Sequence, residues 1–195
     1  MSDQLIAEIL HRSAEVKQKM IPVCVDQAEE AAQMIAGSMK QGGKLMFCGN
    51  GGSAGDSQHL AAEFVATLDH TKPRPGLPAL ALTTDSSFLT AYSNDFGFEG
   101  VFARQVQALG QPGDVLVGIS TSGNSKNVIA AAQVARDKEI SFIGMTGEGG
   151  GQMAQLADLL LAVPSSVTMH IQECHIALGH AITARVEQLM AGTGE

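Results

Sequence analysis

Short apolar runs alternate with helical patterns along most of this chain of 195 residues. The apolar runs lie at 44–48, 77–82, 114–119, 140–145 and 159–163, and helical patterns follow at about 53–66, 128–137 and 168–190. Short buried strands that alternate with helices are typical of a parallel sheet covered on both faces. The pattern therefore predicts an α/β fold with a five-stranded parallel sheet, helices on both faces and right-handed crossovers.

The first 41 residues show helical spacing only. In two stretches, apolar residues recur at the spacing that puts them on one face of a helix. The first consists of Leu5, Ile6, Ile9 and Leu10, and the second of Ala28, Ala31, Ala32, Ile35, Ala36 and Met39. Pro22 lies between the stretches, and proline interrupts a helix because it lacks an N–H. We expect an N-terminal helical pair over 1–41 that ends at Gly42 and Gly43. No linker or repeat separates it from 42–195, so a single domain over 1–195 is expected.

Composition narrows the class of protein. Apolar residues make up 45% and charged residues 16%, an ordinary globular balance. The formal net charge of −8 argues against direct nucleic-acid binding, and no stretch reaches the roughly 20 apolar residues of a membrane span. Three widely spaced cysteines, Cys24, Cys48 and Cys174, argue against disulfides and a cysteine zinc site. Without a signal-peptide pattern, we expect a cytoplasmic protein with no membrane partner.

Two loops of small polar residues follow the first and third apolar runs, at 49–53 (GNGGS) and 120–125 (STSGNS). In open α/β sheets, ligands bind beyond the carboxyl ends of the strands. Glycines let the backbone approach a ligand, and hydroxyls beside helix N-termini favour a phosphate. Each loop alone could be only a turn and a helix cap. Two such loops on one sheet favour a phosphate site, although neither has dinucleotide spacing or a P-loop lysine.

A carboxylate and two histidines lie on the helical patterns around these loops. His59 and Glu63 are four residues apart and share a helix face near the first loop, and Gln172 and His180 on the last helix can face the same cleft. A carboxylate with an imidazole can move a proton between adjacent carbons through an enediol. The four residues could instead bind a divalent metal. The His59–Glu63 pair could also be a surface pair, and His180 a core histidine.

Four strings carry a family likeness: CGNGGSAGDSQHLAAEF, TTDSSFLTAYSNDFGF, QVQALGQPGDVLVGISTSGNS and IQECHIALGH. They resemble, in order over 42–187, the bacterial sedoheptulose 7-phosphate isomerases (phosphoheptose isomerases) of the SIS (sugar isomerase) superfamily. The resemblance implies a SIS-type three-layer sandwich and a homotetramer with active sites at subunit interfaces. It implies conversion of sedoheptulose 7-phosphate to D-glycero-D-manno-heptose 7-phosphate, the first step of ADP-heptose synthesis for the lipopolysaccharide core.

The resemblance also implies roles for individual residues. Glu63 is similar to the family's general base and His180 to its acid/base partner. The phosphate cradle would be Ser53, Ser120, Thr121, Ser122 and Ser125. Further substrate contacts would be Asn50, Gly51, Gly52, Asp95 and Gln172. Some relatives hold zinc with residues equivalent to four positions here, which implies one zinc per subunit: His59, Glu63, Gln172 and His180.

Two positions depart from the family pattern, and one related group has another function. Many relatives carry Arg where this chain has Thr67, and some carry Asp where it has Met169. We expect Lys72 or Arg74 to supply the missing positive charge. The chain also resembles a DnaA initiator-associating protein that keeps the fold and the tetramer but acts by protein binding. That group lacks an acid at the Glu63 position, so Glu63 favours the isomerase.

Overall fold

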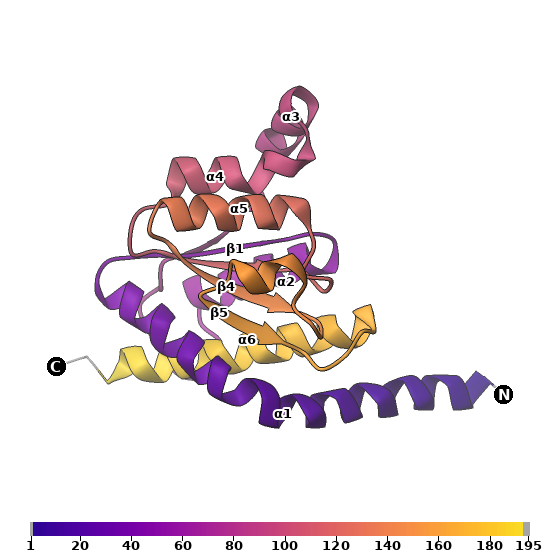
Figure 1. Cartoon of the computed structure of the whole chain (residues 1–195). Coiled ribbons are helices and arrows are strands. Elements are labelled where there is room, and N and C mark those ends of the chain that lie inside the picture. Colours follow the sequence, from indigo (N-terminus) through magenta and orange to yellow (C-terminus); the bar gives the residue numbers. More distant parts are fainter. Residues whose placement is uncertain (1, 193–195) are drawn as a thin grey trace.

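A five-stranded, all-parallel sheet forms the centre of the protein (Figure 1). The computed structural model describes residues 2–192. In space the strands are ordered β2-β1-β3-β4-β5, with β1 Leu45–Gly49, β2 Ala79–Ala81, β3 Val115–Ile119, β4 Ser141–Thr146 and β5 Leu159–Ala162. Each of the five predicted apolar runs overlaps one of these strands, so the α/β prediction with a five-stranded parallel sheet is confirmed.

Helices cover both faces of the sheet, which makes a three-layer sandwich (Figure 1). They are α1 Ser2–Lys40, α2 Gly52–Val65, α3 Ser86–Phe96, α4 Val101–Leu109, α5 Lys126–Asp137 and α6 Thr168–Ala191, with short 3₁₀ turns η1 Phe98–Gly100 and η2 Gly151–Gln155. Helices α1, α2 and α6 lie on one face, and α4 and α5 lie on the other. None of the helices described is long and apolar enough to cross a membrane.

The strand side chains divide between two hydrophobic cores because successive residues of a strand point to opposite faces. On β1, Leu45 and Phe47 pack toward α1, α2 and α6, while Met46 and Cys48 pack toward α4 and α5. All five residues of β1 are buried, as are all five of β3. Strands buried on both faces read as continuous apolar runs, which is why they could be predicted from the sequence.

The predicted N-terminal helical pair is wrong, because α1 is one helix that continues through Pro22. Proline removes one hydrogen bond and crowds the preceding turn, at a cost of about 3 kcal/mol. Met20 and Cys24, on either side of Pro22, are both buried in the core. Their burial offsets that cost and keeps the chain helical across the proline. Figure 1 shows a bend along α1, the expected response to an internal proline.

The segment from α3 to α4 was not predicted as helical. Asp85 begins α3 by accepting a hydrogen bond from the backbone N–H of Phe88, but no residue of α3 is buried. Helix α3 projects from the sandwich (Figure 1), and its partly buried Leu89 and Tyr92 pack against the core formed with α4 and α5. Phe88, Tyr92 and Phe96 recur at helical spacing and their rings are in contact, so the sequence carried a helical signal here that was not used.

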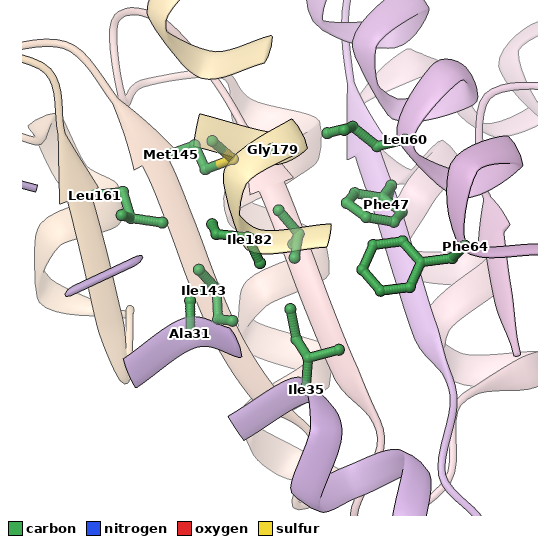
Figure 2. Close-up of a pocket in the computed structure, with 11 residues that line it drawn as sticks. Ala31, Ile35, Phe47, Leu60, Phe64, Ile143, Met145, Leu161, Gly179 and Ile182 are labelled. Atoms are coloured by element: carbon green, nitrogen blue, oxygen red, sulfur yellow. The ribbon is translucent and has the colours of Figure 1, made fainter. Parts of the chain in front are cut away.

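Helices α2 and α6 approach each other closely at Gly179. A Cβ atom on Gly179 would stand 2.6 Å from both Cδ atoms of Leu60 on α2. Figure 2 shows both residues beside Phe47, Phe64 and Ile182 around a cavity of only ≈ 10 Å³. This space holds at most about one water and is apolar, so the core here is close-packed. The absence of a side chain at Gly179 therefore sets the spacing of α2 and α6.

We predict that Gly179→Ala destabilises the protein by about 1–3 kcal/mol, because the new methyl group would force buried Leu60 to shift within the core. Gly37→Ala is the matched control, since Gly37 is also helical but a Cβ there would meet nothing within 4 Å. The control should gain about 0.5–1 kcal/mol. Urea unfolding of both variants measures the difference. Equal gains in both would show that the contact does not limit helix spacing.

A buried histidine on α6 makes stability depend on pH. The Nε2 of His175 donates a hydrogen bond to the carbonyl oxygen of Thr146 at 3.0 Å, and burial lowers the pKa of His175 to about 4. An unfolded histidine has its pKa near 6.5, so the unfolded state takes up a proton first as pH falls. The stability contributed by neutral His175 is present above about pH 6.5 and is lost as the pH falls toward 4.

We predict that the free energy of unfolding is about 2 kcal/mol lower at pH 5 than at pH 7 because of His175. Chemical unfolding of the wild type and of His175→Gln at both pH values measures this contribution. The variant should lose that part of the pH dependence, because glutamine can donate the same hydrogen bond but does not titrate. An unchanged difference between the two pH values would contradict the assignment to His175.

Candidate active site

The two polar loops lie side by side at the carboxyl edge of the sheet. They follow β1 and β3, which are adjacent and parallel, with Gly49 opposite Ile119 in the register. The chain leaves β1 toward β2 on one side, whereas β3 leads to β4 on the other. Ligands of open α/β sheets bind at such a switch in strand order, outside the carboxyl ends of the strands. The strand order thus brings both loops to the place where a ligand is expected.

The first loop needs glycine at two positions. Gly51 has φ +57° and ψ −121°, a backbone conformation that side chains disfavour. A Cβ on Gly49 would stand 2.8 Å from the backbone and side chain of Ser53. Helix α2 then begins at Gly52 without a side-chain cap. The N–H groups of Ser53 and Ala54 donate to the carbonyl oxygens of Asn50 and Gly51 within this turn. What the loop offers to an anion is therefore the positive end of the α2 dipole, approached over a backbone that glycines leave uncovered.

The second loop gathers hydroxyl groups at the start of α5. The Oγ atoms of Ser120 and Ser125 are 2.8 Å apart, and those of Ser120 and Ser122 are 3.4 Å apart. Ser125 occupies the N-cap position of α5, but its hydroxyl makes no capping bond. Hydroxyls add hydrogen-bond donors beside a second helix N-terminus, so the two loops together offer uncharged groups of the kind that bind a phosphate.

A reciprocal pair of amides joins the two loops. Asn50 Nδ2 donates to Asn127 Oδ1 at 2.9 Å, and Asn127 Nδ2 donates to Asn50 Oδ1 at 2.9 Å. Asn127, in the first turn of α5, is buried. The pair fixes the first loop against the second. The family resemblance implies a substrate contact for Asn50. Asn127 was not singled out from the sequence, since nothing in the local pattern marks a contact between residues 77 positions apart.

The predicted acid/base residues come together between α2 and α6. The Nε2 atoms of His59 and His180 are 2.7 Å apart, and the rings meet edge to face. The same His59 nitrogen lies 3.5 Å from Glu63 Oε1. Glu63 and His180 therefore converge on one atom, although they lie far apart in the sequence. The cluster is open to the outside in a single chain, since the side chain of His59 is 47% exposed and that of Glu63 20%.

Gln172 also faces this site but is bonded to a residue that the sequence analysis did not select. Its Nε2 donates to Oδ1 of Asp56 on α2 at 2.6 Å. Asp56 is buried, and burial raises its pKa, while the hydrogen bond from Gln172 and the nearby imidazoles of His59 and His180 lower it. These contacts place Asp56 and Gln172 beside His59 and His180, in one cluster between α2 and α6.

The structure does not bring Asp95 to this cluster within one chain. Asp95 lies near the end of α3, is exposed, and accepts a hydrogen bond from Asn94 at 2.9 Å. Helix α3 packs on η1 and α4, on the opposite face of the sheet from α6. A contact of Asp95 with substrate would therefore require a second subunit.

Arg74 also lies away from the polar loops. Its guanidinium donates to Glu187 and to the backbone carbonyls of Glu63 and Phe64, at the C-terminal end of α2. The loops lie at the other end of this helix, about 20 Å away. Lys72 forms an ion pair with Asp69 at 3.2 Å. In a single chain, Arg74 thus supports the end of α2 and does not reach the proposed phosphate site.

The cluster fits zinc in the type of its donor atoms. Two imidazole nitrogens, a carboxylate and an amide oxygen are N and O ligands that zinc accepts. The spacing is tight, because nitrogens bound to one tetrahedral zinc would be about 3.3 Å apart, whereas His59 and His180 bond to each other directly. Across residues 2–192, no three His, Cys, Asp or Glu side chains are arranged as a ready metal site. Zinc binding would require the two rings to separate slightly.

The sequence of this chain is similar to those of proteins in a known family of sugar-phosphate isomerases. The family model described as "SIS domain" matches residues 9–147. A phosphoheptose isomerase of Nitratidesulfovibrio vulgaris is 54% identical over 92% of this chain and 85% of its own length. One of Rhodospirillum rubrum is 53% identical over 86% of this chain and 88% of its own.

A solved structure leads to the same family. Phosphoheptose isomerase GmhA from Neisseria gonorrhoeae superposes with a TM-score of 0.91 at 43% identity, covering 96% of this chain and all of its own. Similarity of this extent, in sequence and in structure, identifies the relationship. This chain belongs to the phosphoheptose isomerase family of SIS domain proteins.

Proposed function

We propose that this enzyme converts sedoheptulose 7-phosphate to D-glycero-D-manno-heptose 7-phosphate, the step that begins ADP-heptose synthesis. The observation that carries the proposal is the convergence of Glu63 and His180 on His59 Nε2. This cluster lies about 10–16 Å along α2 from the two polar loops, a span that a seven-carbon sugar phosphate can bridge. The relatives' name, phosphoheptose isomerase, supplies the substrate class. A carboxylate and an imidazole at one end and an anion site at the other match a sugar with a terminal phosphate.

The reaction needs one proton moved between neighbouring carbons. In our proposal, Glu63 removes a proton from C1 of the ketose while His180 protonates the carbonyl oxygen on C2, which gives the enediol. Glu63 then returns the proton to C2, and His180 takes the proton from the hydroxyl on C1, which becomes the aldehyde. Both groups end in their starting states. The contact between Nε2 of His59 and Nε2 of His180, at 2.7 Å, orients the His180 ring.

The phosphate is held by dipoles and hydroxyls in this proposal. Its oxygens accept hydrogen bonds from the N–H groups at the start of α2 and α5 and from Ser53, Ser120, Thr121, Ser122 and Ser125. The amide pair of Asn50 and Asn127 supports this role, because it fixes the two loops at a constant separation. Anchoring the phosphate places C1 and C2 at the other end, near Glu63 and His180.

Zinc would be held by His59, Glu63, Gln172 and His180. When bound, it would polarise the oxygens on C1 and C2 and so favour loss of the carbon-bound proton. The nitrogen and oxygen donors converging there support this part of the proposal.

The enzyme is proposed to act as a cytoplasmic homotetramer with active sites between subunits. Large apolar side chains are exposed in two separate regions. They are Leu5, Ile6 and Leu10 on α1, and Phe96 and Phe98 where α3 ends and η1 begins. Exposed apolar surface of this extent is typical of an interface. Asp95 lies beside Phe96, so a subunit contact through α3 would carry Asp95 toward a neighbour's site. The three buried, unpaired cysteines suit the reducing cytoplasm.

We predict that Glu63→Gln lowers turnover by about 10²–10⁴-fold, because the amide cannot accept the C1 proton. Sedoheptulose 7-phosphate is incubated with the protein in deuterium oxide, and the aldose and deuterium at C1 and C2 are followed by NMR. The variant should keep the wild-type fold and assembly. Glu30→Gln, at an exposed position on α1, is the control and should exchange at the wild-type rate.

Two outcomes would contradict this assignment. Full activity of Glu63→Gln would show that another group is the base. No turnover and no exchange by the wild type, with or without added zinc, would contradict the isomerase itself. Binding of the replication initiator in that case would support the initiator-associating alternative.

We predict that chelator-treated protein takes up one zinc per subunit and that His59→Ala weakens this binding at least about tenfold. Competition with a chromophoric chelator measures the affinity without reference to activity. His11→Ala removes an exposed histidine on α1 and should bind zinc like the wild type. Equal affinity of wild type and His59→Ala would contradict the proposed ligand set.

A further inference from the structure

A buried carboxylate lies at the site without a role in the chemistry proposed above. Asp56 stands three residues before His59 on α2 and is only 6% exposed. Its Oδ1 accepts the hydrogen bond from Gln172, while its Oδ2 is buried and has no hydrogen-bond partner in the described part of the chain. Burying a carboxylate oxygen without a partner costs stability. A residue that adds nothing but packing would not need this charge.

The hydrogen bond to Asp56 determines which way the Gln172 amide faces. The NH₂ and O ends of an amide have nearly the same shape, so packing alone does not distinguish the two orientations. A carboxylate accepts hydrogen bonds but does not donate them, so Asp56 selects the nitrogen end. The oxygen Oε1 is thereby directed away from Asp56, and no hydrogen bond to it comes from residues 2–192.

Gln172 lies directly over the first polar loop. Its Cγ, Cδ and Nε2 atoms are 3.5–3.7 Å from the point where a Cβ on Gly52 would stand. The amide is therefore confined between Gly52 below and Asp56 beside it. In this position, an amide oxygen of fixed direction can serve as an acceptor for a sugar hydroxyl or as a metal ligand.

We propose that Asp56 is a positioning residue, which holds the Gln172 amide by its nitrogen so that Oε1 is presented to the sugar and to a zinc ion. This inference rests on the proposed function, in which Gln172 contacts both. Carboxylates that orient a ligating side chain commonly change metal affinity or activity about 10–100-fold when removed. Asp56 would act in this way from the same helix that carries His59 and Glu63.

A rival explanation is an electrostatic effect on the two imidazoles, because Asp56 also lies near His59 and His180. The two explanations differ in one respect. Positioning through Gln172 disappears when Gln172 is removed, whereas the charge acts on the imidazoles whether or not Gln172 is present. A double-mutant cycle separates them.

The cycle consists of Asp56→Ala, Gln172→Ala and the double variant. We expect Asp56→Ala to lower kcat/KM and zinc affinity about 10–100-fold, and to change either by less than about twofold when Gln172 is already alanine. Equal losses in both backgrounds would overturn the inference in favour of the electrostatic effect. An Asp56→Ala variant with wild-type kcat/KM and zinc affinity would also overturn it.

A swapped pair tests the same contact without creating a cavity. Gln172→Glu places a second carboxylate against Asp56, which should impair zinc binding and turnover. Adding Asp56→Asn supplies an NH₂ group to the new carboxylate, so the double variant should recover at least about tenfold of the loss. No recovery would contradict the proposed contact, even if Asp56→Ala fails to fold.

Asp114→Asn is the matched control. Asp114 is a buried carboxylate at the opposite end of the sheet, where it pairs with Lys44 and accepts backbone hydrogen bonds. This variant should lower the melting temperature and leave kcat/KM and zinc affinity unchanged. If Gln172→Ala alone has no effect, the inference and the Gln172 assignment both fail, while the Glu63 exchange experiment still tests the isomerase separately.

Discussion

The close approach of α2 and α6 is the constraint on which the site depends. Gly179 has no side chain, so Leu60 packs directly against the backbone of α6. His180 is the next residue after Gly179, and His59 the residue before Leu60, so the helix contact brings the two imidazoles within 2.7 Å. Glu63 lies one turn further along α2. The packing of Leu60 on Gly179 in the core therefore also brings together the side chains proposed to act in catalysis, on the outer side of the same two helices.

The sheet supplies the second half of the arrangement. The switch in strand order between β1 and β3 places two helix N-termini next to each other, and the reciprocal Asn50–Asn127 pair fixes them. A protein of net charge −8 can bind an anionic sugar in this way, because the donors are backbone N–H groups and hydroxyls and not lysines. The acidity of the chain and its phosphate site are thus compatible.

Much of this architecture could be predicted from the sequence, for identifiable reasons. Strands buried on both faces leave apolar runs, and the polar loops that follow them stand out against those runs. Helix α3 was missed although Phe88, Tyr92 and Phe96 recur at helical spacing along it. The helix break predicted at Pro22 was wrong. The prediction counted the hydrogen bond that proline lacks, but not the burial of Met20 and Cys24 on either side of it. Asp56 and Asn127 were missed because their partners are 116 and 77 positions away.

In the proposed reaction, Glu63 and His180 act on one pair of sugar carbons while the phosphate lies at the start of α2 and α5. A crystal structure of Glu63→Gln with sedoheptulose 7-phosphate tests it most directly. We expect C1 and C2 within about 3.5 Å of the side-chain amide introduced at position 63 and the C2 oxygen within hydrogen-bond reach of His180, with the phosphate among Ser120, Ser122 and Ser125. A sugar bound with its carbons out of reach of both side chains, or with its phosphate away from the two loops, would contradict the account.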